Sequence, residues 1–196
     1  MSKKDTILKV ATRLFAVKGF DGTSVRKIAE EAGLSVAGMF HYIPSKEEIL
    51  NEIMIGFMDE GYKKLIKIYN CDMSPIEKLA EVCKFYVKYY AGHKNQLTIL
   101  VSEGKSLSLE HRQVFIDKQR IYVNALTRLF NDLTKEDLLN PIDPSILAFI
   151  FFGMVHWTYS WYKPKGEIGP EELGNIVSEV FLRGILKYRG ETESKE

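Results

Sequence analysis

Hydrophobic residues recur every three or four positions along almost the whole chain, which is the period of an α-helix. In residues 4–18, for example, Ile7, Val10 and Leu14 fall on one stripe, and Gly19 is expected to end that helix. Further helices are predicted over 46–68, 75–90, 109–132, 144–162 and 170–188, with a shorter one over 96–103. No segment alternates apolar and polar residues over a useful length. The pattern therefore predicts an all-α fold of about nine helices.

Residues 23–50 contain two short helices joined by a tight turn. Apolar residues around Ile28 have helical spacing, and Gly33 can adopt the left-handed backbone that a sharp helix exit requires. Ser35 then caps a second helix, which Pro44 ends because proline disfavours helical geometry at the residue before it. This arrangement predicts a helix-turn-helix, whose second helix can enter the major groove of DNA.

Capping signals mark the start of several of the longer helices. Ser45 with Glu48, and Ser74 with Glu77, have the spacing of capping boxes. The helix that begins after Ser45 is long and of mixed polarity. It is expected to leave the helix-turn-helix unit and to join a larger second domain.

Composition and charge are consistent with a folded globular protein and exclude few other classes. Apolar residues make up 45% of the 196 residues, which is enough for a substantial core. The formal net charge of +1 argues against a protein that coats nucleic acid indiscriminately, although residues 1–50 hold eight Lys and Arg against six Asp and Glu. Two cysteines, Cys71 and Cys83, lack a CxxC spacing and are expected to be reduced thiols, with a regulatory disulfide as the alternative.

Neither the first residues nor the most apolar run indicates a membrane protein. The N-terminal segment lacks the uninterrupted apolar core of a signal peptide. The run Ile146–Val155 is about ten residues long and too short to span a bilayer. We therefore expect a soluble, cytoplasmic protein without membrane partners.

The first fifty or so residues resemble the TetR family of transcriptional repressors. The motif residues, in order, are Ile7, Ala11, Leu14-Phe15, Lys18-Gly19-Phe20, Thr23, Ile28-Ala29, Ala32-Gly33-Leu34-Ser35, Phe40-His41-Tyr42, Lys46-Glu47 and Ile49-Leu50. The resemblance implies a DNA-binding domain over residues 1–45 and a domain for effector binding and dimerisation over residues 46–196. The alternative is a three-helix bundle that binds no DNA.

The resemblance also implies which residues contact DNA. These are Thr23, Ser24, Arg26, Lys27, Ser35, Val36, Ala37, Gly38, Phe40, His41, Tyr42 and Lys46. The small apolar residues at 36–38 would read thymine methyl groups, while the polar and cationic residues would hold the phosphate backbone. Two positions depart from the family pattern, which often has Thr at the position of Gly38 and usually has Tyr at that of Phe40.

The last two long helices carry more apolar surface than one small domain covers. We expect Phe149, Tyr159, Ile176, Val180, Leu182 and Ile185 to form a dimer face, because the resemblance implies a four-helix bundle between two copies. The alternative is that these side chains merely close the monomer core.

Aromatic residues gather in the second half of the chain and could line an effector pocket. The candidate lining residues are Phe85, Tyr86, Tyr89, Leu100, Phe115, Gln119, Tyr122, Phe152, His156, Trp157 and Trp161. Plain core is the alternative interpretation. The segment from Trp157 to Leu173 looks like that of TetR-type regulators of fatty-acid and sterol catabolism, which implies an acyl-CoA effector. Arg112, Lys118, Arg120 and Lys105 could neutralise the CoA phosphates.

Enzymatic and metal-dependent functions have little support. The four histidines lack HExxH or other ligand spacing, and no GxSxG or phosphate-binding glycine loop is present. The sequence therefore predicts a non-enzyme without cofactor or metal. We expect a homodimeric repressor released from a palindromic operator by a small hydrophobic effector, with a multidrug-type repressor or an all-α small-molecule carrier as alternatives.

Overall fold

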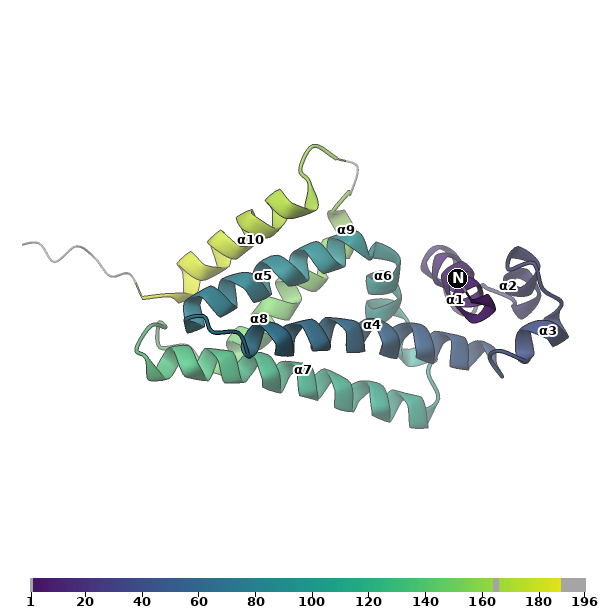
Figure 1. Ribbon diagram of the computed structural model, residues 1–196, viewed down its shortest axis with the longest axis horizontal. Coiled ribbons are helices and arrows are strands. Elements are labelled where there is room, and N and C mark those ends of the chain that lie inside the picture. The colour runs from purple at the N-terminus through teal and green to yellow at the C-terminus, as the bar shows by residue number, and fades with distance from the viewer. Residues whose placement is uncertain (1, 164–165, 188–196) are drawn as a thin grey trace, which may run out of the picture. The chain divides into compact units, whose positions relative to one another are not determined.

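The computed structural model describes residues 2–163 and 166–187, and these form helices joined by short connections (Figure 1). In chain order the helices are α1 (Lys3–Lys18), α2 (Val25–Glu31), α3 (Val36–Phe40), α4 (Lys46–Tyr69), α5 (Pro75–Gly92), α6 (Lys94–Ser102), the 3-10 turn η1 (Gly104–Ser106), α7 (Leu109–Lys135), α8 (Pro144–His156), α9 (Thr158–Trp161) and α10 (Pro170–Ile185). Within the described residues, extended pairing is limited to an isolated bridge between Leu139 and Leu186. The all-α prediction is confirmed.

Side-chain caps mark several helix starts, including the predicted ones at Ser35, Ser45 and Ser74. The Ser24 hydroxyl accepts a hydrogen bond from the Lys27 amide, and the Ser35 hydroxyl accepts one from the Gly38 amide. Ser74 and Glu77 form the complete capping box, with each side chain accepting from the other residue's backbone amide. These local bonds fix where the helices begin, which explains why sequence patterns located them well.

The predicted helix over 144–162 is wrong in one respect, because the structure divides it. Helix α8 ends at His156, and α9 begins at Thr158. At this break the buried Thr158 hydroxyl donates to the Val155 carbonyl at 2.7 Å. The last helix, α10, ends at Ile185. Just beyond it, the Lys187 amide donates a hydrogen bond to the Leu138 carbonyl. The predicted end of this helix at Tyr188 lies outside the described residues.

The chain packs as two compact units, and each unit combines two segments that are separate in the sequence. One unit consists of residues 1–63 and 93–121, and the other of residues 64–92 and 122–196. Helices α4 and α7 each begin in the first unit and end in the second. The first unit therefore includes α6 and the start of α7 in addition to the helix-turn-helix. The division at residue 45 remains a proposal about function.

Each unit has its own buried core. In the first unit, Ile7, Phe15, Ile28 and Met39 are at most 1% exposed. In the second, Tyr86, Leu126, Phe130 and Phe151 are fully buried. Among the described residues, no helix is long and apolar enough to cross a membrane.

Two glycines allow a matched test of the turn between α2 and α3. Gly33 has φ +68°, and Gly56 lies inside α4; an added Cβ would meet no atom within 4 Å at either position. Because only backbone conformation then differs, Gly33→Ala should destabilise the protein by about 1 kcal/mol and Gly56→Ala should stabilise it by about 0.5–1 kcal/mol. Urea unfolding at one protein concentration measures both. Shifts of the same sign would contradict the assigned turn.

Candidate DNA-binding and effector sites

Helix α3 presents one face to solvent and buries the other. Val36, Phe40 and Tyr42 are 36%, 40% and 46% exposed, whereas Met39 and Ile43 are completely buried. Ser35, Ala37 and His41 are exposed as well, and Gly38 is half-buried. The predicted reading face is therefore accessible, and the buried side chains on the opposite side of the helix anchor it to the rest of the unit.

The start of α2 supplies further polar groups beside the helix-turn-helix. Arg26 is exposed. Lys27 lies 3.3 Å from a Glu30 oxygen and 3.5 Å from a Glu31 oxygen. These are surface ion pairs of small energy, so Lys27 can exchange them for a phosphate at little cost.

Two of the predicted phosphate contacts, Thr23 and Lys46, are engaged within the protein in this structure. Thr23 is 1% exposed, and its hydroxyl donates to the Gly19 carbonyl at 2.9 Å. The Lys46 ammonium donates to the carbonyls of Phe20 and Thr23 at 2.9 and 3.0 Å, and it lies 4.1 Å from the centre of the Phe20 ring. Both residues thus hold the turn between α1 and α2, because its carbonyls have no helical partner.

A further residue that the sequence did not single out supports the same turn. The Glu103 carboxylate, at the end of α6, accepts the Phe20 amide hydrogen at 3.2 Å. Its other oxygen accepts from the Ser106 hydroxyl at 2.9 Å. The peptide groups of Phe20 are therefore held by a cation from α4 and a carboxylate from beyond α6. A separation of 83 residues leaves no sequence signal for this contact.

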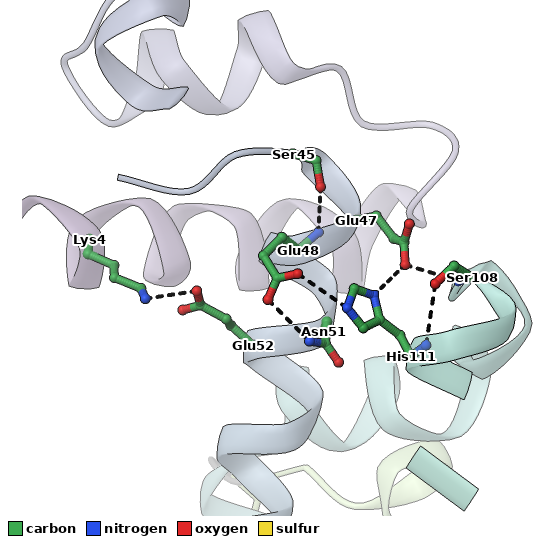
Figure 2. Close-up of polar contacts among 8 residues, drawn as sticks. All are labelled: Lys4, Ser45, Glu47, Glu48, Asn51, Glu52, Ser108 and His111. Carbon is green, nitrogen blue, oxygen red and sulfur yellow. Dashed lines mark hydrogen bonds and ion pairs between the residues drawn. The ribbon is translucent and has the colours of Figure 1, made fainter. Parts of the chain in front are cut away.

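A second set of unpredicted polar contacts joins the starts of α4 and α7 (Figure 2). The Glu47 carboxylate accepts from the Ser108 amide at 3.0 Å and lies 2.5 Å from His111 Nδ1. Nε2 of the same imidazole lies 3.3 Å from a Glu48 oxygen. Ser108 caps α7 by accepting the His111 amide hydrogen. The spacing of Glu47 and Glu48 gave no indication of a partner about 60 residues away.

Six of the predicted effector residues form one aromatic cluster in the second unit. Phe85, Tyr86, Tyr89, Tyr122, Phe152 and His156 are linked, with Tyr90, by ring centroid distances of 5.0–6.2 Å. The rings come from α5, α7 and α8. Burial raises the pKa of Tyr86 and of Tyr90 well above the usual value. The cluster is a packed core that also contains tyrosine hydroxyls and an imidazole, and its role in effector binding stays a prediction.

His156 contributes one of the hydrogen-bonding side chains of the cluster. Its Nε2 lies 3.2 Å from the Tyr90 hydroxyl. Burial lowers the pKa of the imidazole to about 4, which keeps the ring neutral at physiological pH.

The other five predicted effector residues are placed differently. Leu100 and Phe115 are buried in the first unit, and Gln119 is exposed there. Trp157 and Trp161 are 60% and 51% exposed. Trp157 comes four residues after the exposed Gly153, so it lies on the outer side of α8.

Exposed apolar residues gather on α8 and α10, as the dimer prediction requires. Phe149, Ile176 and Val180 are 65%, 42% and 64% exposed, while Tyr159 and Leu182 are half-buried. Ile146 and Ile150 add to the exposed side of α8. Ile185 is the exception: it is 6% exposed, because it packs inward at the last turn of α10.

The first unit also contains an open groove that the sequence did not predict. It has a volume of about 570 Å³ and lies among α1, α4 and α6. Phe57 and His93, whose ring centroids are 5.9 Å apart, contribute to its lining, together with Lys9, Arg13, Glu52 and Glu60. The lining mixes charges of both signs and contains none of the predicted effector residues.

The buried imidazole gives the protein a measurable acid sensitivity. The pKa of His156 is lower in the folded state than its value of about 6.5 in an unfolded chain, so below pH 6.5 the unfolded state binds more protons. The contribution of His156 to the free energy of unfolding should therefore be constant above about pH 7 and fall as the pH drops. We expect His156→Phe to remove about 2 kcal/mol of the decrease between pH 7.5 and 5.0, measured by urea unfolding. An equal decrease in both proteins would contradict this placement.

Two family models match the chain. The first, described as bacterial regulatory proteins of the tetR family, matches residues 7–53. The second, described as a Tetracyclin repressor-like C-terminal domain, matches residues 72–185, which is more than half of the chain. The two matches include the helix-turn-helix, the aromatic cluster and the exposed faces of α8 and α10.

Individual proteins are similar over nearly the full length. The HTH-type transcriptional repressor KstR2 of Mycobacterium tuberculosis is 26% identical over 192 residues, which cover 95% of this chain and 94% of that protein. The fatty acid metabolism regulator protein of Bacillus subtilis is 24% identical over 181 residues, covering 91% and 93%. The crystal structure of AibR in complex with isovaleryl coenzyme A and operator DNA has a TM-score of 0.83 and 29% identity, covering 91% of this chain and 97% of that chain.

The comparisons and the geometry agree. A helix-turn-helix with an accessible second helix occupies the segment that the first model matches, and an all-α domain with an aromatic core occupies the second. The chain belongs to the TetR family of bacterial transcriptional regulators, as the residues of its helix-turn-helix predicted.

Proposed function

We propose that the protein is a homodimeric repressor that binds a palindromic operator and leaves it when a small hydrophobic effector binds. The observation that carries this proposal is the accessible face of α3, where Val36, Phe40 and Tyr42 are exposed although Met39 beneath them is fully buried. A helix held in this way can enter a major groove without unfolding.

The chemistry of this face favours contact with thymine methyl groups and with phosphates. Val36 and Ala37 offer small apolar groups, while His41, Tyr42 and Arg26 offer donors. Few side chains here can make bidentate bonds to bases. Specificity would then depend partly on the shape of the operator.

Dimerisation supplies the second reading helix that a palindrome requires. Two recognition helices would be about 34–36 Å apart, or a multiple of this distance. The exposed apolar side chains of α8 and α10, Phe149 and Val180 foremost, support a contact between two copies, since a monomer would leave them in water.

An acyl-CoA is the candidate effector. The similar protein AibR was crystallised with isovaleryl coenzyme A and operator DNA, and another relative is a fatty acid metabolism regulator. The cluster around Tyr86 and Phe152 offers apolar surface for an acyl chain, which would enter by displacing rings that now pack on one another. A repressor of the multidrug type, sensing another lipophilic compound, is the alternative.

Release from DNA has an energetic requirement. The effector must bind the released arrangement more tightly than the DNA-bound one, because equal affinity for both shifts nothing. Moving the population from 1:99 to 99:1 requires a preference of about 5.5 kcal/mol. Displacing packed rings changes the positions of α5, α7 and α8, and α7 continues into the unit that contains the reading helix.

The decisive experiment is fluorescence anisotropy on DNA upstream of this protein's own gene, with and without a long-chain acyl-CoA. We expect nanomolar binding that weakens steeply between about 50 and 200 mM salt and is reversed by acyl-CoA but not by free CoA. Arg26→Ala should weaken binding about tenfold, whereas Arg128→Ala, an exposed arginine of the other unit, should not.

Each result of this experiment decides a separate part of the proposal. Tight binding that ignores acyl-CoA would retain the repressor and reject this effector. Failure to bind this DNA, and also a library of random genomic fragments, would favour the small-molecule carrier.

The dimer face can be tested independently of DNA. Phe149→Glu and Val180→Glu place a charge on side chains that are 65% and 64% exposed, so the monomer should fold while the dimer is lost. Val17→Glu, on a 76% exposed residue of α1, is the matched control and should remain dimeric. Sedimentation equilibrium measures the mass. A wild-type monomer, or variants that remain dimers, would contradict this face.

A further inference from the structure

The turn between α1 and α2 is held by two charged side chains that bond to the same residue, Phe20. Glu103 Oε1 accepts the Phe20 amide hydrogen at 3.2 Å, and the Lys46 ammonium donates to the Phe20 carbonyl at 2.9 Å. Glu103 directly follows α6, whereas Lys46 is the first residue of α4. All three residues belong to the first unit. We name residues 19–24, which join α1 to α2, the Phe20 turn.

The backbone of the Phe20 turn depends on an acceptor from outside α1. Gly19 leaves the helix at φ +73° and ψ 166°, and its amide donates to the Phe15 carbonyl. The next amide, that of Phe20, donates to Glu103 instead. Because a partly buried backbone N–H needs a partner, the path of the chain after α1 relies on where this carboxylate lies.

The carboxylate of Glu103 is itself held in place. Its second oxygen accepts from the Ser106 hydroxyl at 2.9 Å, and the Ser106 amide donates to the Glu103 carbonyl at 2.9 Å. Helix α6, which Glu103 follows, packs against α1. The acceptor for Phe20 is therefore in position before any DNA is bound.

The Phe20 turn sets where α2 begins. The Thr23 amide donates to the Phe20 carbonyl at 3.2 Å, and the Thr23 hydroxyl donates to the Gly19 carbonyl at 2.9 Å. Ser24 caps α2 directly afterwards, and Arg26 stands on the first turn of that helix. Because α2 packs against α3, a shift of the turn would displace the groups that flank the reading face.

We propose that Glu103 is a positioning residue for operator binding, which acts through the Phe20 turn and not by contact with DNA. Binding groups must be held within about 0.5 Å of their productive geometry, so loss of the bond to Phe20 lowers affinity. The charge of Glu103 has the opposite effect, because a carboxylate repels phosphates and its removal alone would strengthen binding. This inference rests on the proposed DNA-binding function.

Two substitutions separate the reach of the side chain from its charge. Glu103→Asp keeps the charge but withdraws the carboxylate by about 1.5 Å, which takes it out of hydrogen-bond distance of the Phe20 amide. Glu103→Gln removes the charge but keeps an oxygen that accepts from Phe20, and its NH2 group can donate to the Ser106 hydroxyl oxygen. Glu110→Asp and Glu110→Gln, on an exposed glutamate of the same unit, are the matched controls.

Hydrogen exchange of the Phe20 amide, measured by NMR, tests the contact without DNA. We expect Glu103→Asp to lower the protection of this amide by about fivefold or more, while Glu103→Gln retains it. The Leu34 amide, which donates to the Ala29 carbonyl at 2.9 Å, is the internal reference and should be unaffected in both variants. Unchanged protection of Phe20 in Glu103→Asp would overturn the proposal.

Fluorescence anisotropy on operator DNA at one salt concentration tests the functional part. Glu103→Asp should weaken binding about tenfold, whereas Glu103→Gln and both Glu110 variants should stay within about twofold of the wild type. Equal affinity in Glu103→Asp and the wild type, or a loss in Glu103→Gln as large as in Glu103→Asp, would contradict the positioning role.

Two further outcomes separate this role from fold stability and from the proposed function. Urea unfolding shows whether each variant is folded under the assay conditions, and an unfolded Glu103→Asp would make Glu103 a residue of the fold and overturn the positioning role. A wild-type protein that binds no DNA would refute the proposed function and this role with it, and the exchange result would still decide the contact.

Discussion

A helix of five residues cannot hold its own shape in water, and this constraint governs the first unit of the protein. Helix α3 spans only Val36–Phe40, far below the length at which an isolated helix is stable. Its conformation must come from burial of Met39 and Ile43 and from the elements beneath them. The turn at Phe20 is fixed for the same reason, by Lys46 from α4 and Glu103 from the end of α6. The orientation of the reading face therefore depends on buried residues and on neighbouring elements as well as on the helix itself.

This arrangement explains how much of the molecule could be predicted. Helix starts depend on bonds between residues three apart, so capping residues such as Ser35 and Ser74 revealed them. The break after His156 was missed because nothing in the apolar pattern of residues 144–162 marks it. The exposed positions of α3 followed from helical periodicity combined with the family resemblance.

Candidate site residues could be predicted only where their exposure follows from their position on a single helix face. Phe149 and Val180 were correctly expected to be accessible, while Ile185, on the same helix as Val180, turned inward at its end. Lys46 was assigned to a phosphate because its position in the motif suggests one, yet its ammonium binds two carbonyls of the chain itself. Contacts across about 60 or more residues, such as that between Glu47 and His111, leave no trace in local spacing.

The placement of the tryptophans has a spectroscopic consequence. The chain contains two tryptophans, and both lie on the exposed side of α8 and α9, at 60% and 51% exposure. Neither belongs to the helix-turn-helix or to the packed aromatic cluster. Intrinsic tryptophan emission therefore reports on whatever covers this face, by a shift to shorter wavelength when water is excluded. No tryptophan lies among the residues that are proposed to contact DNA, so DNA binding at α3 would not change this emission directly.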